Sequence, residues 1–152
     1  MSTAPTAVDA AADPSEVAAR LRLSATRLAR RLRQQADAGL TPSQLSALAV
    51  IDVHGPLTLG SLADHERVAP PSITKLVNKL EAEGLIQRTT DLADRRITRV
   101  ATSAQGASLL AESRRRKTAW LTSRIGQLDA DAQQRLAAAL DVLDALASEE
   151  RP

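Results

Sequence analysis

The chain has 152 residues, the size of one domain, and carries a formal net charge of only +2. Hydrophobic residues make up 43% of it but aromatic residues only 1%, so alanine and leucine must fill the core, which favours helix packed on helix. The absence of cysteine excludes disulfides, thiolate metal sites and thiol-based redox sensing. No apolar run approaches the length of a membrane span and no signal-peptide pattern is present, so we expect a cytoplasmic protein.

Residues 1–12 are small and polar without periodicity, which predicts a disordered tail. A helix over residues 13–38 follows, because Asp13, Pro14 and Glu16 form a helix start. Its apolar stripe consists of Val17, Leu21, Leu28 and Leu32. It also carries six arginines: Arg20, Arg22, Arg27, Arg30, Arg31 and Arg33. We interpret them mainly as a solvated face that pairs with acids elsewhere in a dimer, the alternative being that some contact DNA phosphates or an anionic effector.

A second helix is predicted after Gly39, because Thr41 and Gln44 have the spacing of a capping box. Gly55 and Pro56 should stop this helix. Its predicted inward face is Leu45, Leu48, Ala49 and Val53. The sequence therefore predicts a helix that begins after Thr41 and stops at Gly55.

Two short elements should follow. Residues 57–59 read as an extended segment that could become a third strand of a small sheet. Residues 60–67 read as a short helix with Leu62 and Ala63 inside. This helix would be the first of a helix-turn-helix pair, and the next segment the second.

The segment from Pro70 to Glu83 reads as a short amphipathic helix with a sharp start at two prolines and a stop at Gly84. One stripe is apolar at helical spacing: Ile73, Leu76, Val77 and Leu80. The other face carries hydroxyl, amide and ammonium groups, from Ser72, Thr74, Lys75, Asn78 and Lys79. Such groups suit phosphates and base edges, so we predict that these five residues contact DNA.

Residues 85–89 and 97–102 are rich in β-branched side chains and predict two short strands joined by a polar loop, 90–96. Arg95 and Arg96 lie near the tip of that loop. A helix followed by a β-hairpin with arginines at its tip is typical of a winged helix, in which the helix enters the major groove and the wing the minor groove. Asp94, Arg95 and Arg96 therefore join the candidate DNA-binding residues.

Past the wing, residues 102–105 read as another capping box, and a long helix is predicted to about Ile125 or Leu128. Asp129 should cap a last helix with one apolar side, formed by Leu136, Leu140, Leu143 and Ala147. One wing domain cannot cover apolar stripes at both ends of the chain. We therefore expect a homodimer in which residues 13–38 and 103–152 interlock with a symmetry mate, around a DNA-binding part at 40–102.

The sequence resembles the multiple antibiotic resistance regulator (MarR) family of bacterial transcription factors. The matching pieces are VAPPSITKLVNKLEAEGLIQR, the wing signature Asp94-Arg95-Arg96, and the helix start from Thr102 to Gly106. The resemblance implies a mostly α winged helix-turn-helix fold with about six helices, and an ion pair between Asp94 and Arg96. It also implies a homodimeric regulator on a palindromic operator, with repression favoured over activation and release by a small aromatic or phenolic acid.

Other functions are less well supported. His54 and His65 are the only histidines, and without an HxxxH pair or cysteine they point to a surface or inter-domain position rather than a metal site. Trp120 fits a core position better than a ligand platform. No phosphate loop, nucleophile motif or HExxH pair is present, so we expect no enzyme, cofactor or metal. The rival is a winged-helix module that binds protein and not DNA.

Overall fold

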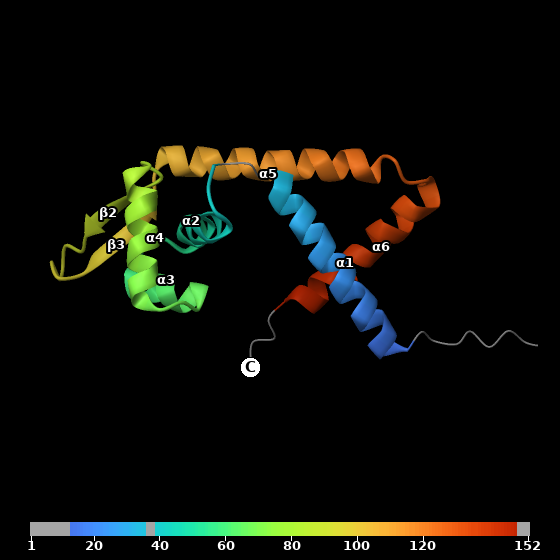
Figure 1. Ribbon diagram of the computed structural model, residues 1–152, viewed down its shortest axis with the longest axis horizontal. Coiled ribbons are helices and arrows are strands. Elements are labelled where there is room, and N and C mark those ends of the chain that lie inside the picture. The colour runs from blue at the N-terminus through green and yellow to red at the C-terminus, as the bar shows by residue number, and fades with distance from the viewer. Residues whose placement is uncertain (1–12, 36–38, 149–152) are drawn as a thin grey trace, which may run out of the picture.

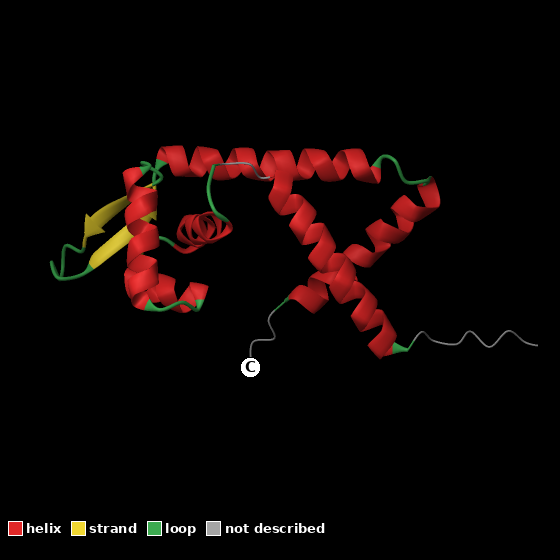
Figure 2. Ribbon diagram, viewed as in Figure 1, coloured by secondary structure: helices red, strands yellow, loops and turns green. Residues whose placement is uncertain are grey.

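The computed structural model describes residues 13–35 and 39–148, so the predicted tail and the end of the first predicted helix lie outside the described residues. The predicted fold class is confirmed: within the described ranges the chain has six helices and one small sheet (Figures 1 and 2). The elements are α1 (Pro14–Gln35), α2 (Pro42–His54), β1 (Leu57–Thr58), α3 (Leu59–Glu66), α4 (Pro70–Ala82), β2 (Ile86–Thr90), β3 (Thr98–Thr102), α5 (Ala104–Ile125) and α6 (Ala130–Ala147).

The molecule has two parts joined by the long helix α5 (Figure 1). At one end of α5 lie the sheet and helices α2, α3 and α4, and at the other end lie α1 and α6. Helix α1 contacts α5, and α2 contacts α5 as well. Helix α5 therefore connects the wing-bearing part to the two terminal helices as one continuous helix.

The sheet has three antiparallel strands in the order β1-β3-β2, which confirms the predicted third strand. Val100 at the centre of β3 pairs with Leu57 on one side and with Arg88 on the other. Val100 is completely buried, while most of β2 is exposed. The sheet thus packs Val100, together with Leu57 and Ile86, into the core and extends the rest of the β2–β3 hairpin away from it as the wing.

Within the described ranges, the buried hydrophobic residues that form the core all come from one stretch of the chain, from α2 to the first turns of α5. Its largest fully buried side chains are Leu48, Ile51, Leu62, Ile73, Leu80, Leu85, Val77 and Val100. The predicted inward face of α2 was partly wrong, because Val53 is 67% exposed while Ala47 and Ile51 are buried. Residues 44, 47, 48 and 51 follow helical spacing, and α3, α4, β3 and α5 all contact α2 on that side. The predicted capping box of Thr41 and Gln44 is confirmed.

Helix α5 begins one residue later than the predicted capping box requires. Thr102 ends β3, and Ser103 is the N-cap, whose hydroxyl accepts from the Gly106 amide (3.0 Å) and donates to the Gly84 carbonyl (2.6 Å). The Ser103 amide also donates to the Leu85 carbonyl (3.0 Å). A Cβ on Gly106 would lie 2.1 Å from the same carbonyl oxygen, so only glycine fits. The start of α5 is therefore fixed against the turn between α4 and β2.

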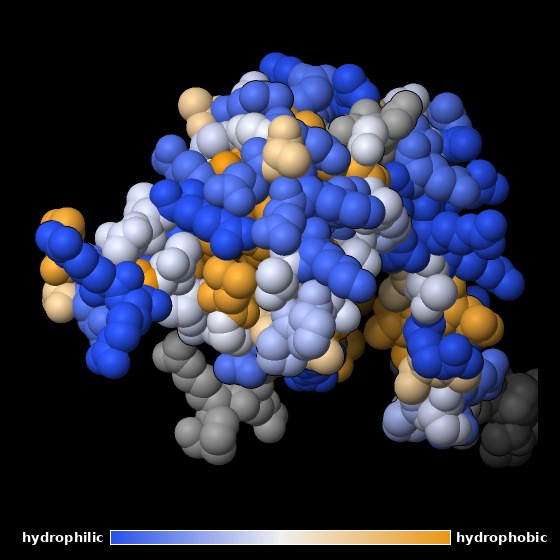
Figure 3. Space-filling model, turned by 60° about the vertical axis from the view of Figure 1, so that its left-hand side comes forward, coloured by the Kyte–Doolittle hydropathy of each residue, from blue (hydrophilic) through white to orange (hydrophobic). Residues whose placement is uncertain are grey.

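The terminal helices α1 and α6 contain no buried residue. Their large hydrophobic side chains are exposed instead, at Val17, Leu23, Leu28, Leu140, Val142 and Leu146. Figure 3 shows hydrophobic side chains gathered on the surface at the side of the molecule away from the wing. No helix among the described residues combines the length and the apolar character needed to cross a lipid bilayer.

Candidate nucleic-acid interface

Helix α4 is held by one completely buried stripe and exposes the face predicted to read DNA. Ile73, Val77 and Leu80 are completely buried against the core. The five predicted contact residues, Ser72, Thr74, Lys75, Asn78 and Lys79, are all exposed. Helix α3 packs against α4 and ends at Glu66, and its C-cap Arg67 has a left-handed backbone (φ 53°) that turns the chain between the two helices. The core thus fixes the orientation of the exposed polar face.

The exposed face of α4 has two sides with different surroundings. Ser72, Lys75 and Lys79 line an open hollow of about 190 Å³ beside the start of α2, together with Thr41, Gln44 and Leu76. The Thr74 hydroxyl donates to the Pro70 carbonyl (3.1 Å) and is satisfied within the helix. Within the described ranges no carboxylate pairs with Lys75 or Lys79. These two ammonium groups are therefore available to an anionic partner.

Asn78 lies on the side of α4 that faces the wing, where it meets a residue that sequence reasoning missed. The guanidinium of Arg88 on β2 donates to the Asn78 side-chain oxygen and also pairs with Glu81 (2.9 Å from Nε to Oε2). Strand alternation could have placed Arg88 on the same face of β2 as the buried Ile86, two residues earlier, but it does not identify the partners on α4. Arg88 links the wing to the second half of α4.

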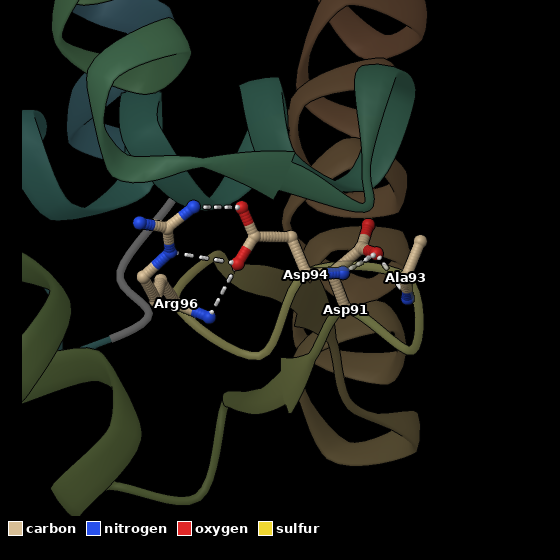
Figure 4. Close-up of polar contacts among 4 residues, drawn as sticks. All are labelled: Asp91, Ala93, Asp94 and Arg96. Atoms are coloured by element: carbon tan, nitrogen blue, oxygen red, sulfur yellow. Dashed lines mark hydrogen bonds and ion pairs between the residues drawn. The ribbon is translucent and has the colours of Figure 1, made fainter.

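The loop of the wing is organised by Asp91, whose carboxylate accepts from the backbone amides of Ala93 (2.8 Å) and Asp94 (3.2 Å) (Figure 4). Its other oxygen lies 3.2 Å from Nε of Arg99 on β3. The two backbone hydrogen bonds, that of Ala93 above all, and then Arg99 lower the pKa of Asp91 below its ordinary value. The loop is therefore folded around an ionised carboxylate at neutral pH.

The predicted ion pair at the tip of the wing is confirmed. The Arg96 guanidinium donates to both oxygens of Asp94, with Nε 3.1 Å from Oδ1 and Nη2 3.2 Å from Oδ2 (Figure 4). The Arg96 amide donates to the same carboxylate (3.0 Å). The side-chain bond from Arg96, followed by the backbone bond, lowers the pKa of Asp94. Arg95 is exposed and has no carboxylate partner within the described part of the chain, so it is the free cation at the tip.

The remaining candidate residues lie outside this surface. The rings of His54 and His65 stack with centroids 4.7 Å apart, where the end of α2 meets α3. Around them, and elsewhere among the described residues, no three metal-ligating side chains come together. Trp120 is half-buried on α5, with the Arg124 guanidinium 5.5 Å from the centre of its ring. None of these side chains belongs to α4 or the wing.

A short helix pair followed by a β-hairpin, with an exposed cationic helix face beside an arginine-tipped loop, defines a winged helix-turn-helix protein. The MarR family model matches residues 40–98. The chain is also 35% identical over 136 residues to an uncharacterized HTH-type transcriptional regulator of Mycobacterium bovis, covering 89% of this chain and 95% of the relative. The chain therefore belongs to the MarR family and is a DNA-binding transcriptional regulator, not an enzyme.

Solved structures agree with this assignment. A putative transcriptional regulator from Pseudomonas aeruginosa is 36% identical, with a TM-score of 0.78, and the match covers 96% of this chain and 100% of that one. A mutant of S. aureus MepR bound to an oligodeoxyribonucleotide shares the fold at 18% identity and a TM-score of 0.69, covering 87% of this chain and 98% of that one. The second likeness shows the fold alone.

Proposed function

We propose that the protein binds a pseudo-palindromic duplex operator as a homodimer and represses transcription from it. Helix α4 would enter the major groove and the wing the flanking minor groove. Ser72, Thr74, Lys75, Asn78 and Lys79 would contact DNA from α4. At the wing, Arg95 would enter the minor groove while Asp94 holds Arg96, and with it the loop, in place.

The observation that supports this most directly is the unpaired positive charge on two neighbouring elements. Lys75 and Lys79 on α4, and Arg95 on the wing, are exposed and make no ion pair within the described ranges. By contrast, Arg114, Arg115 and Arg116 on α5 pair with Asp52 or Glu112. Cations that a protein leaves unpaired on a surface suit the phosphates of a nucleic acid.

The exposed apolar side chains of the terminal helices support the proposed dimerisation. Apolar side chains of α1 and α6 remain exposed in one chain, and a second copy bound about a two-fold axis would cover the same face on both. Each copy then presents one α4. Two such helices engage one duplex when they are about one helical turn apart, roughly 34–36 Å. The operator would therefore contain two similar half-sites at that spacing.

A salt-dependent gel shift on the DNA upstream of the coding sequence tests this proposal. Binding should weaken steeply with salt, and Lys79→Ala should lower the slope of log K against log salt by roughly 0.9 for each phosphate that is no longer neutralised, or about twice that in a dimer. Lys117→Ala removes the same charge from α5 and serves as the matched control. Equal slopes for both variants would show that α4 does not face the phosphates.

The rival function, a protein-binding module, makes a different prediction for the same experiment. If the cationic face binds an acidic protein and not DNA, the duplex should show no gel shift even at low salt. In that case Asn78 would contact no base. A residue that does contact a base contributes about 1–3 kcal/mol of discrimination against the wrong base pair. Asn78→Ala should therefore relax operator specificity if the protein reads DNA.

We further propose that a small aromatic acid regulates binding from the arginine-rich part of α1. Arg27, Arg30, Arg31 and Gln34 line a hollow of about 300 Å³, and α1 contacts α5, whose start is fixed against the wing-bearing part. A carboxylate held there could change the separation of the two α4 helices. Titration with 4-hydroxybenzoate should lower operator affinity and 4-hydroxybenzyl alcohol should not; equal affinity throughout would refute this effector site.

A further inference from the structure

The contact between Arg88 and Asn78 restricts which groups of the Asn78 amide remain free to bind a base. This inference rests on the proposed function, because it assigns a base class to Asn78 on the α4 surface. Arg88 lies on β2, outside both the reading helix and the tip of the wing. Its guanidinium contacts two side chains of α4, the Asn78 amide and the Glu81 carboxylate.

The chemistry of arginine fixes which way round the Asn78 amide lies. A guanidinium has only donors and no acceptor, so the atom of Asn78 that faces it must be the carbonyl oxygen. The opposite orientation would bring two donors together. The amide NH₂ of Asn78 therefore points away from Arg88, and Asn78 is exposed. An asparagine held in this way presents two donors to the solvent.

Glu81 keeps Arg88 in this position. Its Oε2 lies 2.9 Å from Nε of Arg88, and Glu81 is three residues after Asn78, hence on the same side of α4. Side-chain exposure is 31% for Arg88 and 41% for Glu81, so both are partly shielded. Arg88 is thus oriented by two hydrogen-bonding groups of α4 in addition to its own strand.

We propose that Arg88 is a positioning residue that makes Asn78 select a base edge with acceptors, guanine above all, and disfavour adenine. An asparagine that reads adenine uses both of its groups, accepting from N6 and donating to N7. Here the accepting oxygen is already engaged by a cation, which also repels the N6 donor. Guanine presents N7 and O6, both acceptors, in the major groove, and therefore matches the two free donors.

Selection from a library of random-sequence duplexes tests this assignment with the full-length protein. The position read by Asn78 is the one whose base preference disappears in Asn78→Ala. At that position wild type should prefer guanine over adenine by roughly tenfold, the size of one good base contact. Arg88→Met, which frees the oxygen and keeps an unbranched apolar chain in place of the aliphatic part of arginine, should shift the preference there toward adenine.

Two further variants separate positioning from a simple loss of structure. Arg88→Lys retains one donor for the Asn78 oxygen and should restore the guanine preference. Glu81→Gln loosens Arg88 and should give a shift in the same direction as Arg88→Met but smaller. Circular dichroism melting of each variant establishes whether it is folded. If Arg88→Met does not fold, the base preference of Glu81→Gln is measured in its place.

Three outcomes would overturn the inference in distinguishable ways. An unchanged base preference in Arg88→Met would show that Arg88 does not orient Asn78. A uniform loss of affinity at every position, with a lower salt slope, would show that Arg88 contacts a phosphate instead. Failure of the wild-type protein to enrich any sequence would refute the proposed function itself, and the inference with it.

Discussion

The wing-bearing part and the terminal helices of this chain obtain their stability differently. In the wing-bearing part, which runs from α2 to the first turns of α5, side chains such as Leu48, Leu62 and Ile73 are completely buried within one chain. Helices α1 and α6 bury no residue, and Leu140 and Leu146 on α6 are 51% and 68% exposed. The first part can therefore fold around its own core, whereas the second requires a covering surface. On the proposed function, the part that would read DNA and the part that would pair the chains are therefore separate.

The largest effect, on dimerisation and on operator affinity, is expected from a charge placed among the exposed apolar side chains of α6. Leu140→Asp should dissociate the proposed homodimer, because the carboxylate would be desolvated in the interface, and one chain would then bind only one half-site. Loss of the second half-site should weaken operator binding on the order of 100-fold or more. Sedimentation and gel shift measure the two effects. Gln134→Asp adds the same charge at an exposed position about 120° around α6 from Leu140 and should leave both unchanged.

A core substitution tests whether the wing-bearing part is complete within one chain. Leu62 is completely buried on α3, so Leu62→Ala should lower the free energy of unfolding by about 2–5 kcal/mol. Leu92→Ala makes the same change at a residue of the wing loop that is 101% exposed, and should have almost no effect. Urea denaturation compares the two. Similar decreases would mean that this core does not stabilise the molecule as described.

The junction between the two parts can be tested at Gly106. Gly106→Ala should destabilise the protein by about 1–3 kcal/mol, because the added Cβ would lie 2.1 Å from the Leu85 carbonyl oxygen and α5 would have to shift. At Gly60, on α3, the nearest atom to an added Cβ is 3.9 Å away, so Gly60→Ala should be neutral or stabilising. Thermal melting of both variants checks this, and equal melting temperatures would contradict the described packing.

The smallest effect concerns the pH dependence of the wing. The pKa of Asp91 lies below the ordinary 3.8, so the loop should be fully ordered above that pH and lose these hydrogen bonds only as the pH falls through the lowered value. The Ala93 amide resonance should therefore titrate with a midpoint below 3.8, and it is the one to follow because the Asp94 amide also senses its own carboxylate, whose pKa is lowered as well. Asp91→Asn should remove this titration. A midpoint at or above 3.8 in wild type would mean that the carboxylate is not held as described.

Sequence reasoning predicted the elements better than the side-chain contacts. Helical spacing located α4 and its buried stripe, and the β-branched runs located the hairpin, because both patterns are local. The inward face of α2 was partly wrong at Val53, since neighbouring elements decide which of several apolar residues turns inward. Arg88 was missed because its contacts with Asn78 and Glu81 join two elements, and their approach depends on the whole fold.

The central claim is that two copies of α4 and its wing, one from each chain, read one duplex. The number of chains bound to each duplex tests this claim most directly. Sedimentation velocity of a labelled duplex chosen by selection, at low salt and with increasing protein, measures how many chains each duplex binds. We predict two chains per duplex, bound together, with an affinity that falls steeply as salt is added. A complex with a single chain, or no complex even in dilute buffer, would contradict the proposal.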